Sequence, residues 1–334
     1  MSVTTREWEH QVGRRLKLRD LHILAAVVQC GSMAKAASQL AMSQPAVSEA
    51  IASLESALGV RLLDRLPRGI APTLYAHALL KRGQVVFDEL RQGIREIEFL
   101  ADPTIGEVRL ACPETFAAGL LPEAIDRLSR QYPKIVIRVD QPDTRSLGFQ
   151  ELRERSVDLI LVRRPKSLID DDLNMDTLLD DTHRVVVGAN NPLARRRRIA
   201  LKDIVNEPWI LPPNIVVGEL IAEAFAAKGL AVPAERVNSS SIMLRNRLLA
   251  TGRYVTILTD SVLRYNAKVW SLRILPIQLQ ISPRPLAVVT LKHRTLSPAV
   301  RLFIDQLKAV ATSLRETNLK NHDCNCRVRH AAKK

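Results

Sequence analysis

The stretch SQLAMSQPAVSEAIASLE, Ser38–Glu55, contains two apolar patterns at helical spacing that are separated by a short polar step. Ser43 is a preferred N-cap residue, and Pro45 follows in the first turn, where the missing N–H of proline removes no hydrogen bond. Apolar residues then recur every three or four positions over residues 47–58, which predicts a helix with one buried face. The polar start of this helix, including Gln44, is therefore expected to be exposed.

The residues before this stretch predict two more short helices. Apolar residues between Leu18 and Val28 keep helical spacing until Gly31 stops the pattern. Ser32 can cap the next helix, in which Ala37 stands where two helices cross too closely for a larger side chain. Three short helices joined this tightly predict a helix-turn-helix, whose last helix enters the major groove of DNA N-terminus first.

The candidate DNA contacts lie at the helix starts and in the segment after Gly59. The Ser43 hydroxyl and the N–H groups beside it can meet a phosphate, and Gln44 and Ser48 can reach base edges. Each of these residues alone would more simply cap or solvate a helix. The segment VRLLDRLPRGIAPT predicts a wing that contacts the DNA backbone or minor groove, the alternative being a solvated hairpin. The candidate contacts are Ser32, Lys35, Ser43, Gln44, Pro45, Ser48, Arg65 and Arg68.

Composition agrees with a nucleic-acid partner but does not locate its site. The chain has 334 residues, of which 46% are hydrophobic, enough for two or three domains. Its formal net charge of +14 favours nucleic acid, anionic membranes or acidic ligands. Its four cysteines do not form a disulfide framework, and neither a secretory signal nor a run of about eighteen apolar residues is present. A cytoplasmic protein is therefore expected.

A long helix is expected after the wing. Thr73 can cap it, and its apolar residues from Leu79 to Ile97 form a seam near heptad spacing. The helix should continue to about Leu100. A long helix with one apolar side between two domains is more consistent with dimerisation than with a monomer's linker.

After Pro103 the pattern changes to alternating strands and helices. Strands are expected at GEVRLACP, KIVIRVDQ and VDLILVRR, and HRVVVGANNPLA opens a second set of such units. A strand at RPLAVVTLK and a final helix from SPAVRLF return the chain to the first set. This alternation predicts parallel sheets covered by helices, in two lobes, with a ligand in the crevice at the carboxyl ends of the strands.

Several loops should line that crevice. Thr115 precedes a helix N-terminus, which favours an anion, although a plain N-cap explains this threonine equally well. Arg145 lies where the second strand ends. Its positive charge is unfavourable beside the positive end of a helix unless an anion pairs with it. That anion is either Asp143, in a surface pair, or a carboxylate or phosphate of the ligand. The candidate ligand-binding residues are Thr115, Thr144, Arg145, Arg163, Pro213, Asn214 and Ser240.

The segment LRDLHILAAVVQCGSMAKAASQLAMSQPAVSEAIASLESALGVRLLDR resembles the DNA-binding domain of the LysR-type transcriptional regulators. The resemblance covers roughly Leu16 to Leu314. It implies a multidomain chain: an α-rich winged helix-turn-helix, a long linker helix and a two-lobed α/β effector domain of the periplasmic-binding-protein type. It also implies operator DNA, a small-molecule effector and RNA polymerase as partners, a homotetramer built as a dimer of dimers, and no cofactor. Related regulators often bind an effector carboxylate through a Ser or Thr at the position of Thr115. With Arg145, this makes a small organic or aromatic acid the expected effector.

The chain is expected to begin with an N-terminal extension (1–15), followed by a winged helix-turn-helix (16–73) and a dimerisation helix (74–101). An effector-binding domain (102–314) and a basic disordered tail (315–334) should follow. The first lobe of the effector domain would cover about 105–183 and 284–314, and the second about 184–283. The run Arg195–Arg198 follows Asn191-Pro192 in a connection and is expected to be a solvated loop, the alternative being an accessory polyanion contact. The tail carries His322, Cys324, Cys326 and His330, but Cys-x-Cys is closer than the usual ligand pairs of zinc sites, so no metal is expected.

Two other classes of protein remain as alternatives: an intracellular solute-binding protein and an enzyme on an α/β scaffold, either with an accessory DNA-binding domain. The helix-turn-helix and the missing secretory signal oppose a solute-binding protein of the usual secreted kind, so that only an intracellular form of the first alternative is left. No Gly-rich phosphate loop, Gly-x-Ser-x-Gly motif or histidine pair at metal spacing supports the second. The sequence therefore predicts a DNA-binding transcriptional regulator that is not an enzyme.

Overall fold

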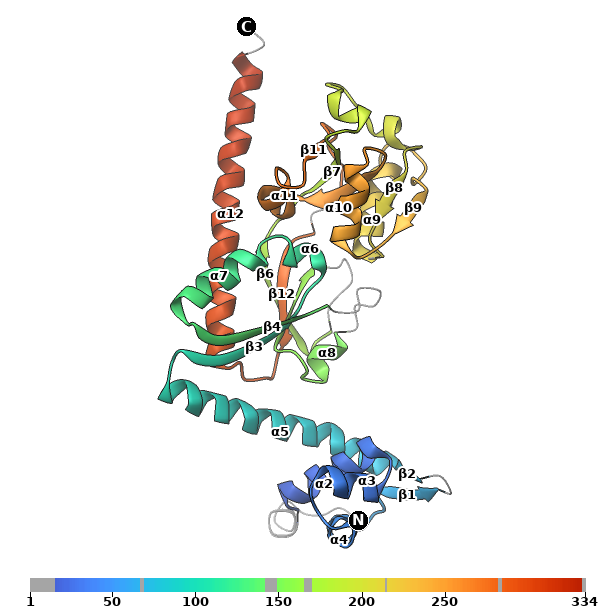
Figure 1. Cartoon of the computed structure of the whole chain (residues 1–334), viewed down its shortest axis with the longest axis vertical. Coiled ribbons are helices and arrows are strands. Elements are labelled where there is room, and N and C mark those ends of the chain that lie inside the picture. Colours follow the sequence, from blue (N-terminus) through green and yellow to red (C-terminus); the bar gives the residue numbers. More distant parts are fainter. Residues whose placement is uncertain are drawn as a thin grey trace. The chain divides into compact units, whose positions relative to one another are not determined.

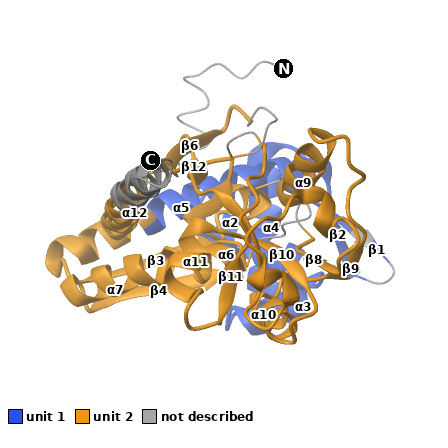
Figure 2. Ribbon diagram, turned by 90° about the horizontal axis from the view of Figure 1, so that it is seen from above, with its two compact units in different colours: residues 1–91 blue, residues 92–334 orange. Residues whose placement is uncertain are grey.

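The computed structural model describes residues 16–66, 69–141, 149–164, 170–213, 215–281 and 284–331, and its helices and strands are labelled in Figure 1. These residues belong to two compact units, residues 1–91 and 92–334, which Figure 2 colours separately. None of the helices in the described ranges combines the length and the apolar character that a membrane span needs.

The first unit is built on three short helices. Its elements are α2 (Leu18–Cys30), α3 (Met33–Gln39), α4 (Gln44–Leu58), β1 (Leu63–Leu66), β2 (Gly69–Pro72) and the first part of α5 (Leu74–Ala101). Gly31 and Gly59 follow α2 and α4 in the left-handed region, at φ 62° and 68°, which glycine adopts without strain. Leu24, Ala36 and Val47, one from each helix, are fully buried in a common core. The predicted helix-turn-helix is confirmed.

A hairpin and a long helix follow. β1 and β2 pair antiparallel, which confirms the predicted strand and return and is the geometry of both a wing and a solvated hairpin. Oγ1 of Thr73 accepts a hydrogen bond from the Ala76 N–H at 3.3 Å and donates to the Arg61 carbonyl at 2.9 Å. Thr73 is therefore the predicted cap of α5, and this helix ends one residue beyond the predicted Leu100.

The second unit begins with the first lobe, a five-stranded sheet covered by helices. Its elements are β3 (Ile105–Ala111), α6 (Glu114–Ala117), α7 (Leu121–Gln131), β4 (Lys134–Asp140), α8 (Gln150–Arg153), β5 (Leu159–Arg163), β6 (Leu173–Leu179), β12 (Leu286–Leu291) and α12 (Pro298–Ala331). The strands lie in the order β4-β3-β5-β12-β6. α7 and α12 pack together beside the sheet (Figure 1), and Leu110, Leu128 and Phe303 are fully buried between them.

The second lobe is a second five-stranded sheet, in the order β11-β7-β10-β8-β9. Its elements are β7 (His183–Gly188), η1 (Pro192–Arg195), η2 (Leu201–Ile204), β8 (Trp209–Leu211), α9 (Ile215–Ala226), β9 (Glu235–Asn238), α10 (Ile242–Ala250), β10 (Val255–Thr259), α11 (Asp260–Asn266) and β11 (Leu272–Ile274). Trp209 is fully buried and packs edge-on against Phe225 of α9, with ring centroids 5.9 Å apart. Arg195–Arg198 is exposed, as expected of a solvated loop.

Both sheets are mixed, so the expectation of parallel sheets is wrong in part. In the first lobe β3 runs parallel to β4 and β5, but β12 is antiparallel to β5 and β6. The register explains this direction, because Leu286 at the start of β12 lies opposite both Arg163 and Leu179, the last residues of β5 and β6. β12 re-enters the lobe at the end where the chain left it and must run backwards.

The final helix is longer than expected. α12 continues to Ala331, beyond the residue 315 at which the tail was expected to begin. No proline or glycine occurs after Pro298. Because these two residues are the strongest helix breakers, nothing in this part of the sequence ends the helix.

A buried ion pair lies where the chain crosses between the lobes, at residues 180–182. Nη2 of Arg163, at the end of β5, lies 2.8 Å from Oδ2 of Asp181, and Nη1 donates to the Asp181 carbonyl at 3.1 Å. The Asp181 carboxylate also accepts from the N–H and the hydroxyl of Ser261 in the second lobe, at 2.9 and 2.7 Å. Because all three side chains are buried, this cluster joins both lobes at one point.

His183 lies beside this ion pair at the start of β7 and is buried. Burial, reinforced by the positive charge of Arg163 and opposed by Asp181, lowers the pKa of its imidazole to about 3. The folded protein therefore keeps His183 neutral at pH values where a free histidine is protonated.

We expect the protein to lose stability as the pH falls from about 6.5 to 4.5. In this window the unfolded chain binds a proton at residue 183 that the folded protein does not. The free energy of unfolding then falls by up to about 1.4 kcal/mol per pH unit. His183→Gln should remove this slope in urea titrations followed by tryptophan fluorescence. His293→Gln, which changes an exposed histidine, should keep the slope. An unaltered slope in His183→Gln would contradict the assignment.

Gly188 in β7 leaves no room for a side chain. A Cβ at this position would lie 2.0 Å from the Leu249 carbonyl oxygen, a backbone atom. Gly188→Ala should therefore lower the free energy of unfolding by about 1–3 kcal/mol in urea titrations. Gly218→Ala is the matched control, because a Cβ on this α9 residue meets nothing within 4 Å, and it should raise stability by about 0.5–1 kcal/mol. Similar effects of the two substitutions would refute this packing.

Candidate functional site

The start of α4 is capped and exposed. Oγ of Ser43 accepts from the Ala46 N–H at 3.3 Å, and Pro45 lies in the first turn. Ser43, Gln44 and Pro45 are all exposed, and Ser48 is half-buried. The hydroxyl hydrogen of Ser43 is not needed for the cap, so this side chain can still donate to a phosphate.

The opposite face of α4 is what holds this start in place. Val47, Ile51 and Leu54 are at most 3% exposed, so the helix cannot rotate without leaving the core. Near its other end, Oε1 of Glu55 accepts from the N–H groups of Leu62 and Leu63 at 2.7 and 3.2 Å. This tie to the hairpin was not predicted, because a glutamate on a helix gives no sign of the strand it will meet.

The structure describes some of the other candidate DNA contacts. Ser32 caps α3, with its Oγ 3.5 Å from the Lys35 N–H, and the Lys35 side chain is exposed. The hairpin is joined to the end of α2, because the Ile70 N–H donates to the Gly31 carbonyl at 3.1 Å. The side chain of Arg65, and Arg68 as a whole, lie outside the described residues.

The structure describes only some of the candidate ligand residues. Thr115 is half-buried inside the short helix α6 and does not cap it, because Pro113 occupies the N-cap position. Pro213 is half-buried after β8, and Ser240 is exposed before α10. Thr144, Arg145 and Asn214 lie outside the described residues, as does Asp143, the alternative partner of Arg145.

Arg163 has a different role from the one predicted for it. Its guanidinium is used inside the chain: besides Asp181 it reaches the Arg284 carbonyl at 3.3 Å and lies over the Phe116 ring at 5.4 Å. This corrects the expectation that Arg163 adds positive charge to an open ligand site. Its place at the end of β5 was predicted, whereas its partner became apparent only once the crossing at Asp181 was known.

Two residues that sequence reasoning missed meet between the lobes. Oε2 of Glu114, from the first lobe, accepts from the Ile242 N–H at the start of α10 at 2.5 Å. Arg245, one turn further along α10, is 2% exposed and interacts electrostatically with Glu114. A signal for Arg245 was available, because it shares the buried helix face of Ile242 and Leu249 at spacings of three and four residues.

A cavity of about 580 Å³ lies beside this contact. First-lobe residues from α6 and α7 form one wall, and second-lobe residues from α10 and the end of α11 form the other. Its lining includes Glu114, Gly119, Glu123, Ile242, Tyr265 and Trp270. A cavity walled by both lobes changes shape whenever the lobes move relative to each other.

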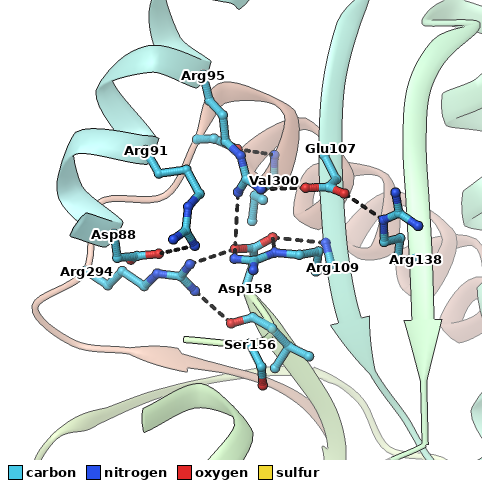
Figure 3. Close-up of polar contacts among 12 residues, drawn as sticks. Asp88, Arg91, Arg95, Glu107, Arg109, Arg138, Ser156, Asp158, Arg294 and Val300 are labelled. Carbon is cyan, nitrogen blue, oxygen red and sulfur yellow. Dashed lines mark hydrogen bonds and ion pairs between the residues drawn. The ribbon is translucent and has the colours of Figure 1, made fainter. Parts of the chain in front are cut away.

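A second buried carboxylate fixes the end of α5 to the first lobe. Figure 3 shows Arg95 of α5, Arg109 of β3 and Arg294 directed at Asp158, with nitrogen–oxygen distances of 3.7, 2.8 and 2.8 Å. Arg95 also pairs with Glu107 of β3 at 2.5 Å. Asp158 is 1% exposed, so its charge is balanced by these arginines and not by water.

The described residues contain no group of three His, Cys, Asp or Glu side chains that could hold a metal ion. The side chains of His322, Cys324, Cys326 and His330 lie outside this description.

Comparison with known proteins shows what this arrangement resembles. The family described as "Bacterial regulatory helix-turn-helix protein, lysR family" matches residues 18–77, and "LysR substrate binding domain" matches residues 101–312. The regulator GbpR of Azospirillum brasilense is 27% identical over 299 residues, which cover 89% of this chain and 87% of GbpR. The dual regulator GltC of Bacillus subtilis is 26% identical over 291 residues, covering 87% of this chain and 96% of GltC.

Solved structures share the fold. A full-length OxyR variant from Pseudomonas aeruginosa matches with a TM-score of 0.60 at 19% identity, covering 90% of this chain and 95% of OxyR. CbnR, a LysR family transcriptional regulator, matches with a TM-score of 0.58 at 19% identity, covering 89% of this chain and 99% of CbnR. Because the substrate-binding family alone matches more than half of the 334 residues and the helix-turn-helix family matches the segment before it, the chain belongs to the LysR family of transcriptional regulators.

Proposed function

We propose that this protein reads its operator through the exposed start of α4 and is controlled by a small organic or aromatic acid bound between its two lobes. The observation that carries the first part is the capped, polar start of α4 on a helix whose other face is fully buried. A helix held in this way enters the major groove as a rigid element, which is what base recognition requires. CbnR, which shares the fold, has been solved in complex with its target DNA.

Gln44 is the proposed base contact. It is exposed in the first turn of α4, and a glutamine amide can bond adenine N6 and N7 at once. Ser43 and the N–H groups beside it would hold a phosphate, as would Lys35 of α3. The chain's net charge of +14 supports the same partner, because phosphate contacts supply most of the affinity for DNA. Contact with RNA polymerase from the DNA-bound form completes this part of the proposal.

The second part of the proposal concerns the effector. Two lobes tied by a buried ion pair where the chain crosses between them, with a cavity walled by both, form the kind of cleft in which a small molecule binds and changes the lobe arrangement. Apart from Arg163, which is used in the buried ion pair, the described members of the predicted ligand set come from both lobes: Thr115 from the first, and Pro213 and Ser240 from the second. Relatives named as transcriptional regulators favour this reading over an enzyme on an α/β scaffold.

Assembly through α5 is also proposed. Val86, Leu90, Ile94 and Ile97 recur every three or four residues on this helix, and each is at least 43% exposed. A continuous exposed apolar seam is unfavourable in water and is typical of a helix that packs against a partner helix. A dimer through α5, and a tetramer of two such dimers, would cover it.

Gln44→Ala should loosen the choice of base at one operator position. The loss of one good base contact lowers discrimination there by about 1–3 kcal/mol while binding to other positions stays the same. Titrations of the full chain against operator variants, each with one base pair changed, measure this directly. Ser56→Ala, on an exposed residue near the other end of α4, is the control and should leave every preference intact. If Gln44→Ala does so too, α4 is not the reading helix.

Replacing Ile94 and Ile97 by glutamate should divide the assembly. Two charges on the apolar seam would be buried without partners in a helix pair, so the dimer should dissociate at micromolar concentration. Sedimentation velocity measures the change in mass. Glu96→Ala removes an exposed charge from the same turn but off the seam, and should leave the mass unaltered. A wild-type protein that sediments as a monomer would rule out the α5 dimer.

A further inference from the structure

The start of α10 already holds a carboxylate. The Ile242 N–H donates to Glu114, which comes from the first lobe, and Oγ of Ser241 accepts from the Leu244 N–H at 3.3 Å. The first N–H groups of a helix have no partner within the helix and carry partial positive charge, so this end favours anions. Here the anion is supplied by the chain itself and from the opposite lobe.

Arg245 makes this helix end unlike an ordinary capped terminus. It is the fourth residue of α10, and a side chain at that position points back towards the start of the helix. Its Nε and Nη2 atoms are buried and have no hydrogen-bond partner among the described residues. The side chain is 2% exposed, and burial lowers its pKa to about 10 although the Glu114 charge opposes this. Within the described ranges, Nε and Nη2 therefore lack the hydrogen-bond acceptor that a buried guanidinium requires.

Two other buried arginines show what a satisfied guanidinium looks like in this protein. Arg163 and Arg294 each place a nitrogen 2.8 Å from an aspartate oxygen. Arg245 instead presents the edge formed by Nε and Nη2, the two donors that bind both oxygens of one carboxylate. No carboxylate of the described residues is paired with this edge of Arg245.

On the basis of the proposed effector function, we infer that Arg245 and the first turn of α10 form an anion site at the contact between the lobes, next to Ile242 and Glu114 of the cavity lining, and that its ligand is a carboxylate group. The Glu114 carboxylate already accepts a hydrogen bond from the Ile242 N–H in the same turn. An acid that binds Arg245 meets Glu114 at the same helix end and repels it, because two carboxylates share one positive site. The effector would thereby compete with a contact that links the lobes.

The test uses the full chain and benzoate, succinate and the neutral analogue benzamide, each at matched ionic strength against sodium chloride. Benzoate or succinate should raise the melting temperature of the wild type by about 2–4 °C at saturating concentration, and benzamide should not. Arg245→Met, which fills the same space without charge, should abolish the shift. Arg245→Lys should lose at least about tenfold in affinity, because lysine keeps the charge but not the paired donors. Glu114→Gln should bind the acids more tightly, since it removes the competing charge.

Arg247→Met is the matched control, because it removes an exposed arginine from the same helix and should keep the shift. A shift that is absent from the wild type, equal in Arg245→Met, or produced as well by benzamide would overturn the inference. Operator binding by gel shift is measured on the same preparations. If every variant still binds the operator, the proposed DNA-binding function stands even when the inference about Arg245 fails. If the wild type binds no operator, the proposed DNA-binding function is refuted, whatever the result for Arg245.

Discussion

The buried pair of Arg163 and Asp181 is the constraint on which the arrangement of the two lobes depends. The Asp181 carboxylate lies between Arg163 of the first lobe and Ser261 of the second. Arg163 and Ser261 each donate two hydrogen bonds to Asp181. Burial alone would raise the pKa of this carboxyl, but Arg163 and the Ser261 donors outweigh it and lower the pKa. The charged pair is therefore retained, and any relative movement of the lobes has to turn about a crossing that itself stays intact.

Asp158 applies the same chemistry at the other end of the first lobe. A buried carboxylate gathers Arg109 from β3, Arg294 from the segment before α12, and Arg95 from α5 (Figure 3). Because removing either partner of a buried pair leaves an unbalanced charge, the C-terminal part of α5 cannot separate from the first lobe cheaply. A change in the first lobe is thus transmitted to a helix whose exposed seam is the proposed site of assembly.

Local signals explain how much of this could be predicted from the sequence. The caps Ser32, Ser43 and Thr73 and the stops Gly31 and Gly59 act on neighbours within four residues, so their helices were predicted with correct ends. Contacts between distant segments were not predictable in this way. The partners of Arg163, Asp158 and Glu114 depend on strand order and on how the lobes meet, which no local pattern encodes. The end of α12 was not predicted either, because no proline or glycine after Pro298 marks it.

An effector can shift the lobes only if it binds their two arrangements with different affinity. The contacts at Asp181 lie at the crossing and gain or lose little when the lobes turn about it. Those further out are different: Glu114 with Ile242, and the Ala118 carbonyl with Nδ2 of Asn266 at 2.7 Å, each join the first lobe to the second. A carboxylate that binds Arg245 acts on the first of these links directly. In the inferred mode of binding, the binding energy of the carboxylate therefore bears on a contact between the lobes.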